Sequence, residues 1–340
     1  MTDHTAVMIC GHGSRDDDAI NEFNRLSGHL KKRLPDFDVE SGFLEFARPV
    51  IRVGLEKLKG RGAKRIVCLP GMLFAAGHVK NDLPSEVHEF ADDNPGIEVI
   101  YGRDLAIDAR LLEAARDRIA EAERAAAGRV ARDDTLLMVV GRGTNDPDAN
   151  SNVAKVARML WEGMGFGWAE VSYSGVAAPL VDAGLARAVR LGFRRIVVFP
   201  YFLFTGILVR RIYDWTAAAA AAHPDIEFLK ASYLNDHARV IDTFVSRVEE
   251  ALNGEANMNC ALCKYRERIV GYEADQGAPQ IGHHHHVRGV GTDGHGAADR
   301  GVYHGHHHHH THGHDHHHDH ANGHHHDHDH HRDHGEKDPA

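Results

Sequence analysis

Two histidines and a glutamate, His12, Glu45 and His78, stand out in this 340-residue chain because their types and spacing suggest chemistry. Each follows a segment that predicts a buried strand, and each lies 33 residues from the next. Neighbouring parallel strands lie about 5 Å apart, so three such strand ends can bring their side chains to one ion. Two imidazoles and one carboxylate leave open positions on a divalent metal, which is typical of a site that transfers a metal or activates a ligand. The spacing therefore predicts one shared metal-binding and catalytic site.

An internal repeat of the sequence preserves the segments around these three residues but not the three residues themselves. A shift of 130 positions, without a gap, places residues 8–16 on 138–146, and the agreement continues over about 70 residues. This register indicates a duplicated unit. At the three positions equivalent to the candidates, the second copy carries Arg142, Gly175 and Leu208. Random change in surface loops is the alternative explanation, but three losses at successive strand ends favour a site that the first copy alone carries.

Alternating strand and helix patterns place both copies in the α/β class, each with a four-stranded parallel sheet flanked by helices. Continuous apolar runs indicate strands that are buried on both faces, and apolar residues at helical spacing indicate the helices between them. The predicted strands are residues 7–10, 39–44, 65–70 and 98–101, then 135–140, 169–174, 195–200 and 226–232. The predicted helices are residues 17–34, 49–59, 79–92 and 108–127, then 147–164, 179–191, 207–222 and 237–252.

These patterns divide the chain into four parts. An active α/β domain is expected at residues 1–127 and a degenerate copy at 135–253, with a polar linker between them. A cysteine-containing segment follows at 254–282, and a segment of low complexity at 283–340. In open parallel sheets, ligands bind at the carboxyl ends of the strands, so a cleft is expected between two facing sheet edges.

The cysteine segment contains a CxxC pair, Cys260 and Cys263. Two thiolates at this spacing chelate one metal or form a redox pair, and two incidental cysteines are the alternative. The pair supplies half of a zinc or iron–sulfur site, so further ligands must come from elsewhere, for instance from a second subunit of a homodimer.

The last 58 residues contain 24 of the 31 histidines, interleaved with Asp and Gly. Their composition is too polar to build a core, so this tail is expected to be disordered. Neutral imidazoles bind Co, Ni, Cu and Zn, which makes the tail a pool of divalent-metal ligands. An expression tag is the alternative, but the interspersed Asp and Gly argue against it.

Several cations near the predicted strand ends are candidates for binding a large anionic substrate. Arg142 is expected on the wall opposite His12, and Arg48 near the end of the second strand. Arginines pair well with carboxylates, although arginines at helix starts are often simply solvated. The candidate substrate-binding residues are Ser14, Arg15, Arg48 and Arg142.

Composition excludes several other classes of function. The formal net charge is −10, much of it in the tail, and the rest of the chain is nearly balanced, so no duplex nucleic acid partner is expected. The longest apolar run, 196–209, is 14 residues long and is too short to span a membrane. The first residues do not resemble a signal peptide, and four cysteines are typical of a reducing compartment, so a cytoplasmic location is expected.

Three segments resemble the class II chelatase family: GHGSRD at residues 11–16, LEFARP at 44–49 and FAAGHVKNDLP at 74–84. The tandem duplication, the MxCxxC motif at 258–263 and the histidine-rich tail resemble the long form of that family. Within that family the chain is similar to the long form of the sirohydrochlorin cobaltochelatases, and the resemblance covers the whole chain.

The resemblance implies ATP-independent insertion of Co²⁺ into sirohydrochlorin, or into its precorrin-2 precursor, in the anaerobic route to cobalamin. It implies the chelatase fold, two flavodoxin-like halves around a tetrapyrrole cleft. It further implies that His12, Glu45 and His78 are the metal and catalytic residues, and that Cys260 and Cys263 hold a 4Fe–4S cluster. Because the second half departs from the motif at all three positions, one active site per chain is expected.

Three other functions remain open at this point. The same reaction can use another metal, ferrous iron for sirohaem or nickel for a related cofactor. A non-enzymatic cobalt or nickel store or chaperone is an alternative of another class, and a redox protein centred on the CxxC pair is a third. The tail favours cobalt or nickel over iron only weakly.

Overall fold

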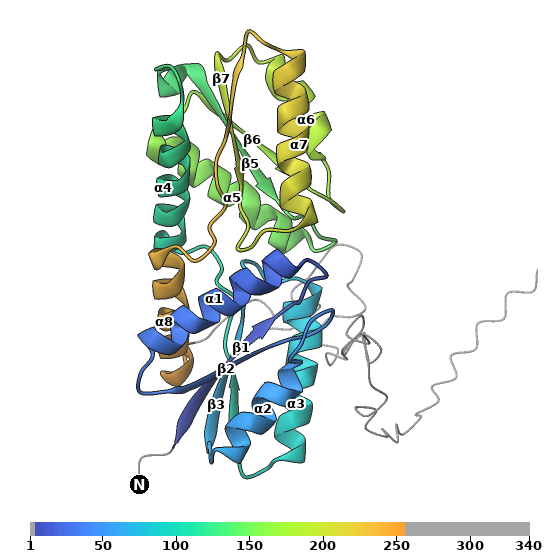
Figure 1. The fold of residues 1–340 in the computed structure, drawn as a ribbon, viewed down its shortest axis with the longest axis vertical. Helices are drawn as coiled ribbons and strands as arrows, with labels where there is room; N and C mark the ends of the chain where they lie inside the picture. Colours follow the sequence, from blue (N-terminus) through green and yellow to red (C-terminus); the bar gives the residue numbers. More distant parts are fainter. Residues whose placement is uncertain (1–3, 256–340) are drawn as a thin grey trace, which may run out of the picture. The chain divides into compact units, whose positions relative to one another are not determined.

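The computed structural model describes residues 4–255, which contain two parallel sheets of four strands each (Figure 1). The first sheet has the order β2-β1-β3-β4 and the second β6-β5-β7-β8, and all their pairings are parallel. The strands are β1 (Thr5–Gly11), β2 (Asp38–Phe43), β3 (Arg65–Pro70), β4 (Glu98–Tyr101), β5 (Thr135–Gly141), β6 (Trp168–Tyr173), β7 (Arg195–Pro200) and β8 (Glu227–Lys230). This confirms the predicted pair of α/β units.

Helices cover both faces of each sheet, and most begin and end within two residues of the predicted positions. The α-helices are α1 (Asp17–Arg33), α2 (Ile51–Gly60), α3 (Leu83–Asp93), α4 (Ala109–Ala125), α5 (Pro147–Met164), α6 (Val181–Val189), α7 (Ile207–Ala222) and α8 (Ala238–Leu252). A π-helical turn, η1 (His78–Asp82), precedes α3, and a 3₁₀ turn, η2 (Arg132–Asp134), precedes β5. The sequence predicted a loop up to His78 and a helix over residues 79–92, whereas His78 itself begins the helical segment, and the first turn of that segment is π-helical.

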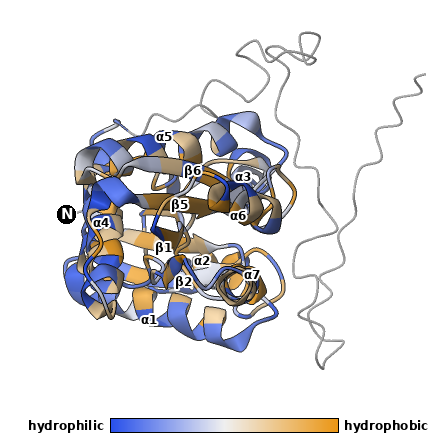
Figure 2. Cartoon of the chain, turned by 90° about the horizontal axis from the view of Figure 1, so that it is seen from above, coloured by the Kyte–Doolittle hydropathy of each residue, from blue (hydrophilic) through white to orange (hydrophobic). Residues whose placement is uncertain are grey.

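Local sequence explains why a helix follows the first strand. Asp16 is the N-cap of α1, and its carboxylate accepts hydrogen bonds from the backbone N–H groups of Asp18 and Ala19. Such caps satisfy N–H groups that have no partner within the helix. The apolar stripe of α1 is buried, with Phe23, Leu26 and Leu30 at most 3% exposed. Figure 2 shows this arrangement, with hydrophobic strands β1 and β5 inside and hydrophilic helix surfaces outside.

The last helix of each half packs against the sheet of the other half. Helix α8 contacts β3 and β4, whereas α4 contacts β7 and β8 (Figure 1). One buried hydrophobic cluster therefore contains residues of both halves, for example Leu26 and Phe244. Arg247 of α8 is 1% exposed, and its guanidinium donates hydrogen bonds to the backbone carbonyls of Asp104 and Leu105. Apolar and polar contacts together tie the two halves to each other.

Two ion-pair clusters also join the two halves, and they occupy equivalent positions in the duplicated sequence. Lys80 donates to Asp146 at 2.7 Å and to Asp148 at 3.1 Å. The equivalents of these three residues, 130 positions away, are Arg210, Asp16 and Asp18, and Arg210 pairs with both aspartates. Burial by itself lowers the pKa of Lys80, but the two aspartates more than compensate and its pKa is raised.

The remaining sequence-based predictions lie outside the described residues or are not tested by them. Cys260, Cys263 and the histidine-rich tail belong to residues 256–340, of which the structure gives no description. The domain boundaries at 127 and 135 stay a prediction. Across residues 4–255, every helix is too short or too polar to span a bilayer.

The two ion-pair clusters differ in burial, which leads to the first prediction. The Lys80 side chain is 2% exposed, whereas that of Arg210 is 52% exposed. Breaking a buried pair leaves charge without compensation, so Lys80→Met should lower the free energy of unfolding by about 3 kcal/mol or more. Arg210→Met should lower it by less than about 1 kcal/mol, since exposed pairs contribute little. Urea denaturation measures both values, and equal losses would contradict the argument.

Candidate functional site

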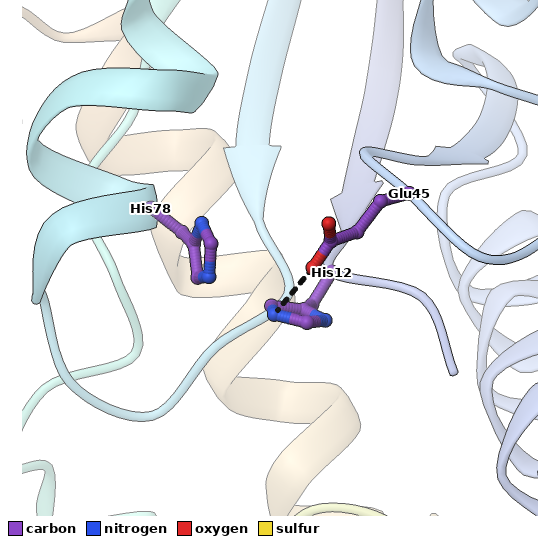
Figure 3. A group of neighbouring side chains, drawn as sticks. All are labelled: His12, Glu45 and His78. Atoms are coloured by element: carbon purple, nitrogen blue, oxygen red, sulfur yellow. Dashed lines mark ion pairs between the residues drawn. The ribbon is translucent and has the colours of Figure 1, made fainter. Parts of the chain in front are cut away.

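The three candidate residues converge at the carboxyl edge of the first sheet (Figure 3). Strand β1 lies between β2 and β3, so the chain leaves three neighbouring strands at this edge. His12 directly follows β1, Glu45 lies two residues beyond β2, and His78 begins the π-helical turn that comes after β3. One ligand atom from each residue lies within 4.8 Å of the others. The predicted convergence of three strand ends is therefore what the geometry shows.

The hydrogen bonds of His12 fix which ring nitrogen faces the other two side chains. Its Nδ1 lies 2.9 Å from the carbonyl oxygen of Gly13. A carbonyl only accepts, so we assign the proton of the neutral ring to Nδ1. The Nε2 atom then presents a lone pair, and it lies 3.3 Å from Oε1 of Glu45. Two acceptors that face each other at this distance favour a cation between or beside them.

The surroundings of His12 keep its imidazole neutral. Burial, Arg142 and His78 lower the pKa of His12 to about 4, in that order of importance. Burial disfavours the charged form of a histidine, and nearby positive charge acts in the same direction. At neutral pH the ring therefore holds no extra proton that would compete with a metal for Nε2.

Backbone contacts hold Glu45 beside His12. The N–H of Glu45 donates to the carbonyl oxygen of His12 at 3.0 Å, so the segments that follow β1 and β2 stay paired beyond the ends of the two strands. Gly13 has φ +98°, and a Cβ at this position would lie 1.7 Å from the carbonyl oxygen of Glu45. Only glycine permits this approach. Gly143 repeats the same arrangement against Gly175 in the second half, with φ +84°.

The four candidate substrate-binding residues differ in their position relative to the cluster and in their contacts. Arg142, from the second half, is exposed, and it is close enough to the cluster to attract the carboxylate of Glu45 and to disfavour a proton on His12. Arg15 lies over the ring of Phe46, 4.8 Å from its centroid, and that ring is 6.3 Å from the ring of His12. Arg48 is exposed, whereas the hydroxyl of Ser14 accepts a hydrogen bond from the N–H of Asp16 at 3.0 Å and has a structural part in the turn.

Two carboxylates near His78 were missed by sequence reasoning. Asp82 accepts a hydrogen bond from Nδ1 of His78 at 2.7 Å. Asp104 is 5% exposed and accepts from the N–H of Ala75, in the loop that carries His78, at 2.8 Å. The repeat contained a signal for Asp82, because the residue 130 positions away is the apolar Ile212. The structural counterpart of Asp104 is Tyr233, since the N–H groups of Leu105 and Leu234 make equivalent hydrogen bonds to the carbonyl oxygens of Met72 and Phe202.

Comparison with known proteins identifies the family. The family model CbiX matches residues 6–122 and again residues 136–251. The chain belongs to the CbiX family. The two matches cover the two halves and coincide with the duplicated fold.

Relatives and solved structures agree with this assignment. The chain is 37% identical over 270 residues to the sirohydrochlorin cobaltochelatase of Priestia megaterium, covering 78% of this chain and 86% of the relative. It is 30% identical to the sirohydrochlorin ferrochelatase of the same organism, covering 74% of this chain and 92% of the relative. The sirohydrochlorin chelatase SirB from Bacillus subtilis subspecies spizizenii, solved in complex with cobalt, is similar in structure, with a TM-score of 0.63 and 27% identity. That similarity covers 74% of this chain and 97% of SirB.

The environment of Asp104 predicts a measurable pH dependence of stability. Burial raises the pKa of Asp104 to about 6. The hydrogen bond from the N–H of Ala75 and the positive charges of Arg103, Arg247 and Lys80 lower this pKa, but by less than burial raises it. A carboxyl with a raised pKa stabilises the fold when protonated, and this contribution is lost as the pH rises through about 4 to 6. From pH 4 to 8, the wild-type free energy of unfolding should fall by about 3 kcal/mol relative to Asp104→Asn.

Chemical denaturation at a series of pH values measures this difference. The exposed Asp92, changed to Asn, is the matched control for the loss of one charge. A constant difference between wild type and Asp104→Asn over the whole range would contradict the raised pKa.

Proposed function

We propose that the chain is a sirohydrochlorin cobaltochelatase that inserts Co²⁺ into sirohydrochlorin, or its precorrin-2 precursor, without ATP. The observation that carries the proposal is the cluster of His12, Glu45 and His78, whose ligand atoms lie within 4.8 Å of one another. It occurs in a member of the CbiX family that is 37% identical to a named sirohydrochlorin cobaltochelatase.

In this proposal, the metal substrate is held before transfer by the two imidazoles and the carboxylate. Neutral imidazoles and one carboxylate suit a divalent first-row metal and leave positions free for the incoming ring nitrogens. His12 contributes a neutral Nε2, because its pKa is lowered to about 4. A site that keeps open positions and releases its ion is consistent with metal delivery rather than a structural role.

Metal insertion also releases protons. One Co²⁺ replaces two pyrrole N–H protons, so the net charge of the macrocycle core is unchanged and two protons must reach solvent. Glu45 is the proposed first acceptor, since its buried carboxylate lies at the cluster. The half-buried, neutral His12 is a poor acceptor at neutral pH, because its pKa is lowered to about 4.

The second half supplies binding rather than a second reaction centre. Arg142 stands where His12 stands in the first half, and Gly175 and Leu208 replace the other two ligands. We propose one active site per chain, with Arg142, Arg48 and Arg15 pairing with carboxylates of the tetrapyrrole, since guanidinium groups bind carboxylates well. Ser14 shapes the turn that presents His12.

Some parts of the proposal concern residues 256–340. We propose that Cys260 and Cys263 contribute to a 4Fe–4S cluster, with further ligands from a second subunit of a homodimer, and that the histidine-rich tail collects divalent metal. None of the steps above passes through the cluster. A cytoplasmic location remains the prediction made from the sequence.

A second candidate differs in the metal. The sirohydrochlorin ferrochelatase of Priestia megaterium is 30% identical, and solved SirB structures contain cobalt in one case and Fe³⁺ in another. Ferrochelatase activity is therefore an alternative, and nickel insertion a further one. Metal storage without catalysis is the alternative of another class.

Anaerobic incubation of the full chain with sirohydrochlorin and Co²⁺ tests the proposal. The visible spectrum should change to that of the metallated ring, and His12→Ala should reduce the rate by at least about 100-fold because a ligand is lost. Fe²⁺ and Ni²⁺ in parallel assays rank the metals. Circular dichroism should show that His12→Ala keeps the fold.

A protein that ends at Glu255 separates insertion from storage. SirB aligns over 97% of its own length with 74% of this chain, so a protein of about this extent exists as a chain of its own. Retained insertion by the shortened protein supports the proposed site. Insertion by the full chain alone would move the essential chemistry to residues 256–340, and metal binding without insertion by either protein would favour storage.

A further inference from the structure

The carboxylate of Asp82 lies directly behind the proposed metal ligand His78. Its Oδ2 is 2.7 Å from Nδ1 of His78, and the residue is 7% exposed. The two residues are the first and last of the π-helical turn η1. Side chains four positions apart lie on the same side of a helical turn and so can meet.

This contact determines how the ring of His78 is presented. An ionised carboxylate only accepts hydrogen bonds, so Nδ1 of the neutral ring carries the proton and Nε2 carries the lone pair. The Nε2 atom lies on the far side of the ring from Asp82. The rings of His78 and His12 are 4.4 Å apart between centroids and meet edge to face at 81°.

We propose that Asp82 is a positioning residue for metal transfer, which holds the ring of His78 in the Nδ1–H tautomer and makes its Nε2 a stronger ligand. The inference rests on the proposed function. Asp82 acts through His78 and does not touch the metal. Carboxylates that accept from a ligating histidine commonly set its orientation and basicity.

The second half provides an internal comparison. The residue equivalent to His78 is Leu208, and α7 is a regular α-helix from Ile207 where the first half has its π-helical turn. The residue 130 positions after Asp82 is Ile212, which is fully buried. Between them the second half keeps Val209 and a cation, Arg210, at the positions of Val79 and Lys80. The histidine, its carboxylate and the π-helical turn that joins them are therefore lost together from the second half. The fold itself does not require a carboxylate at this position.

A helix-capping role does not explain Asp82 either. Asp82 stands at the start of α3, but its side chain makes no capping hydrogen bond there. Its second oxygen, Oδ1, is buried and has no hydrogen-bond partner among the residues that the structure describes. Burying a carboxylate with incomplete hydrogen bonding destabilises a protein. The contact with His78 is the feature of this site that accounts for the residue.

Steady-state kinetics of the full chain test the proposal. Free Co²⁺ is set by a metal buffer, so that other metal-binding residues do not alter it, and sirohydrochlorin is varied separately. Asp82→Ala should raise the KM for Co²⁺ by about 10- to 100-fold, the usual effect of removing such a partner. The KM for sirohydrochlorin should change by less than about twofold, because Asp82 acts on the metal ligand. Asp82→Asn keeps a hydrogen-bond acceptor but no charge, so its KM for Co²⁺ should lie between those of the wild type and Asp82→Ala.

Glu86 provides the matched control. It is 4% exposed and lies four residues after Asp82, in α3, so Glu86→Gln also removes one buried acidic group from this segment. The KM for Co²⁺ of this variant should stay close to the wild-type value. An unchanged KM for Co²⁺ in Asp82→Ala would overturn the proposal, as would equal losses in Asp82→Ala and Glu86→Gln.

Nitrogen NMR of ¹⁵N-histidine-labelled protein gives a readout that needs no activity. The His78 signals are those missing from His78→Ala, and their shifts should report Nδ1–H in the wild type and a mixture or the Nε2–H form in Asp82→Ala. An Nε2–H ring in the wild type would overturn the proposal. If the wild type inserts no metal, the proposed function fails, and this spectrum still decides the role of Asp82.

Discussion

The approach of His12 Nε2 to Glu45 Oε1 is the contact on which the rest of the site depends. These two acceptors are 3.3 Å apart, an arrangement that favours a cation nearby. Backbone contacts produce this approach. The N–H of Glu45 donates to the His12 carbonyl oxygen, and Gly13 permits the segments that follow β1 and β2 to lie close together. The strand order β2-β1-β3 then brings His78 to the same place. Ordinary sheet pairing thus brings the three proposed ligands together without any specialised scaffold.

The duplication separates what the fold requires from what the chemistry requires. Gly13 and Gly143 both adopt positive φ against a carbonyl of the neighbouring loop, so this turn belongs to the frame. The ion pairs of Lys80 and Arg210 are likewise retained in both copies. Only the first half retains His78 with its buried partner Asp82. Polar groups that one copy buries and the other replaces with apolar ones are thus candidates for function, because stability alone favours the apolar choice.

The sequence predicted the strands and helices well, because continuous apolar runs and helical stripes are local signals. His12, Glu45 and His78 were predictable since each follows a strand and is absent from the second copy. Asp82 and Asp104 were not predicted, because their roles depend on a π-helical turn and on a loop that lies next to them only after folding. The exchange of α4 and α8 between the sheets was also missed, since an apolar stripe shows that a helix is buried but not which sheet covers it.

The two histidines differ in what lies behind them, and this difference fits a site that must release its metal. Nδ1 of His12 faces a neutral backbone carbonyl, whereas Nδ1 of His78 faces a carboxylate. A carboxylate partner raises the basicity of a ligand more than a carbonyl does. In the proposed site, His78 is therefore the stronger donor and His12 the weaker. An ion bound in this way can leave its bond to His12 first, as a ring nitrogen takes that position, while His78 still holds it. Stepwise exchange of ligands avoids the large cost of releasing a bare cation into a buried site.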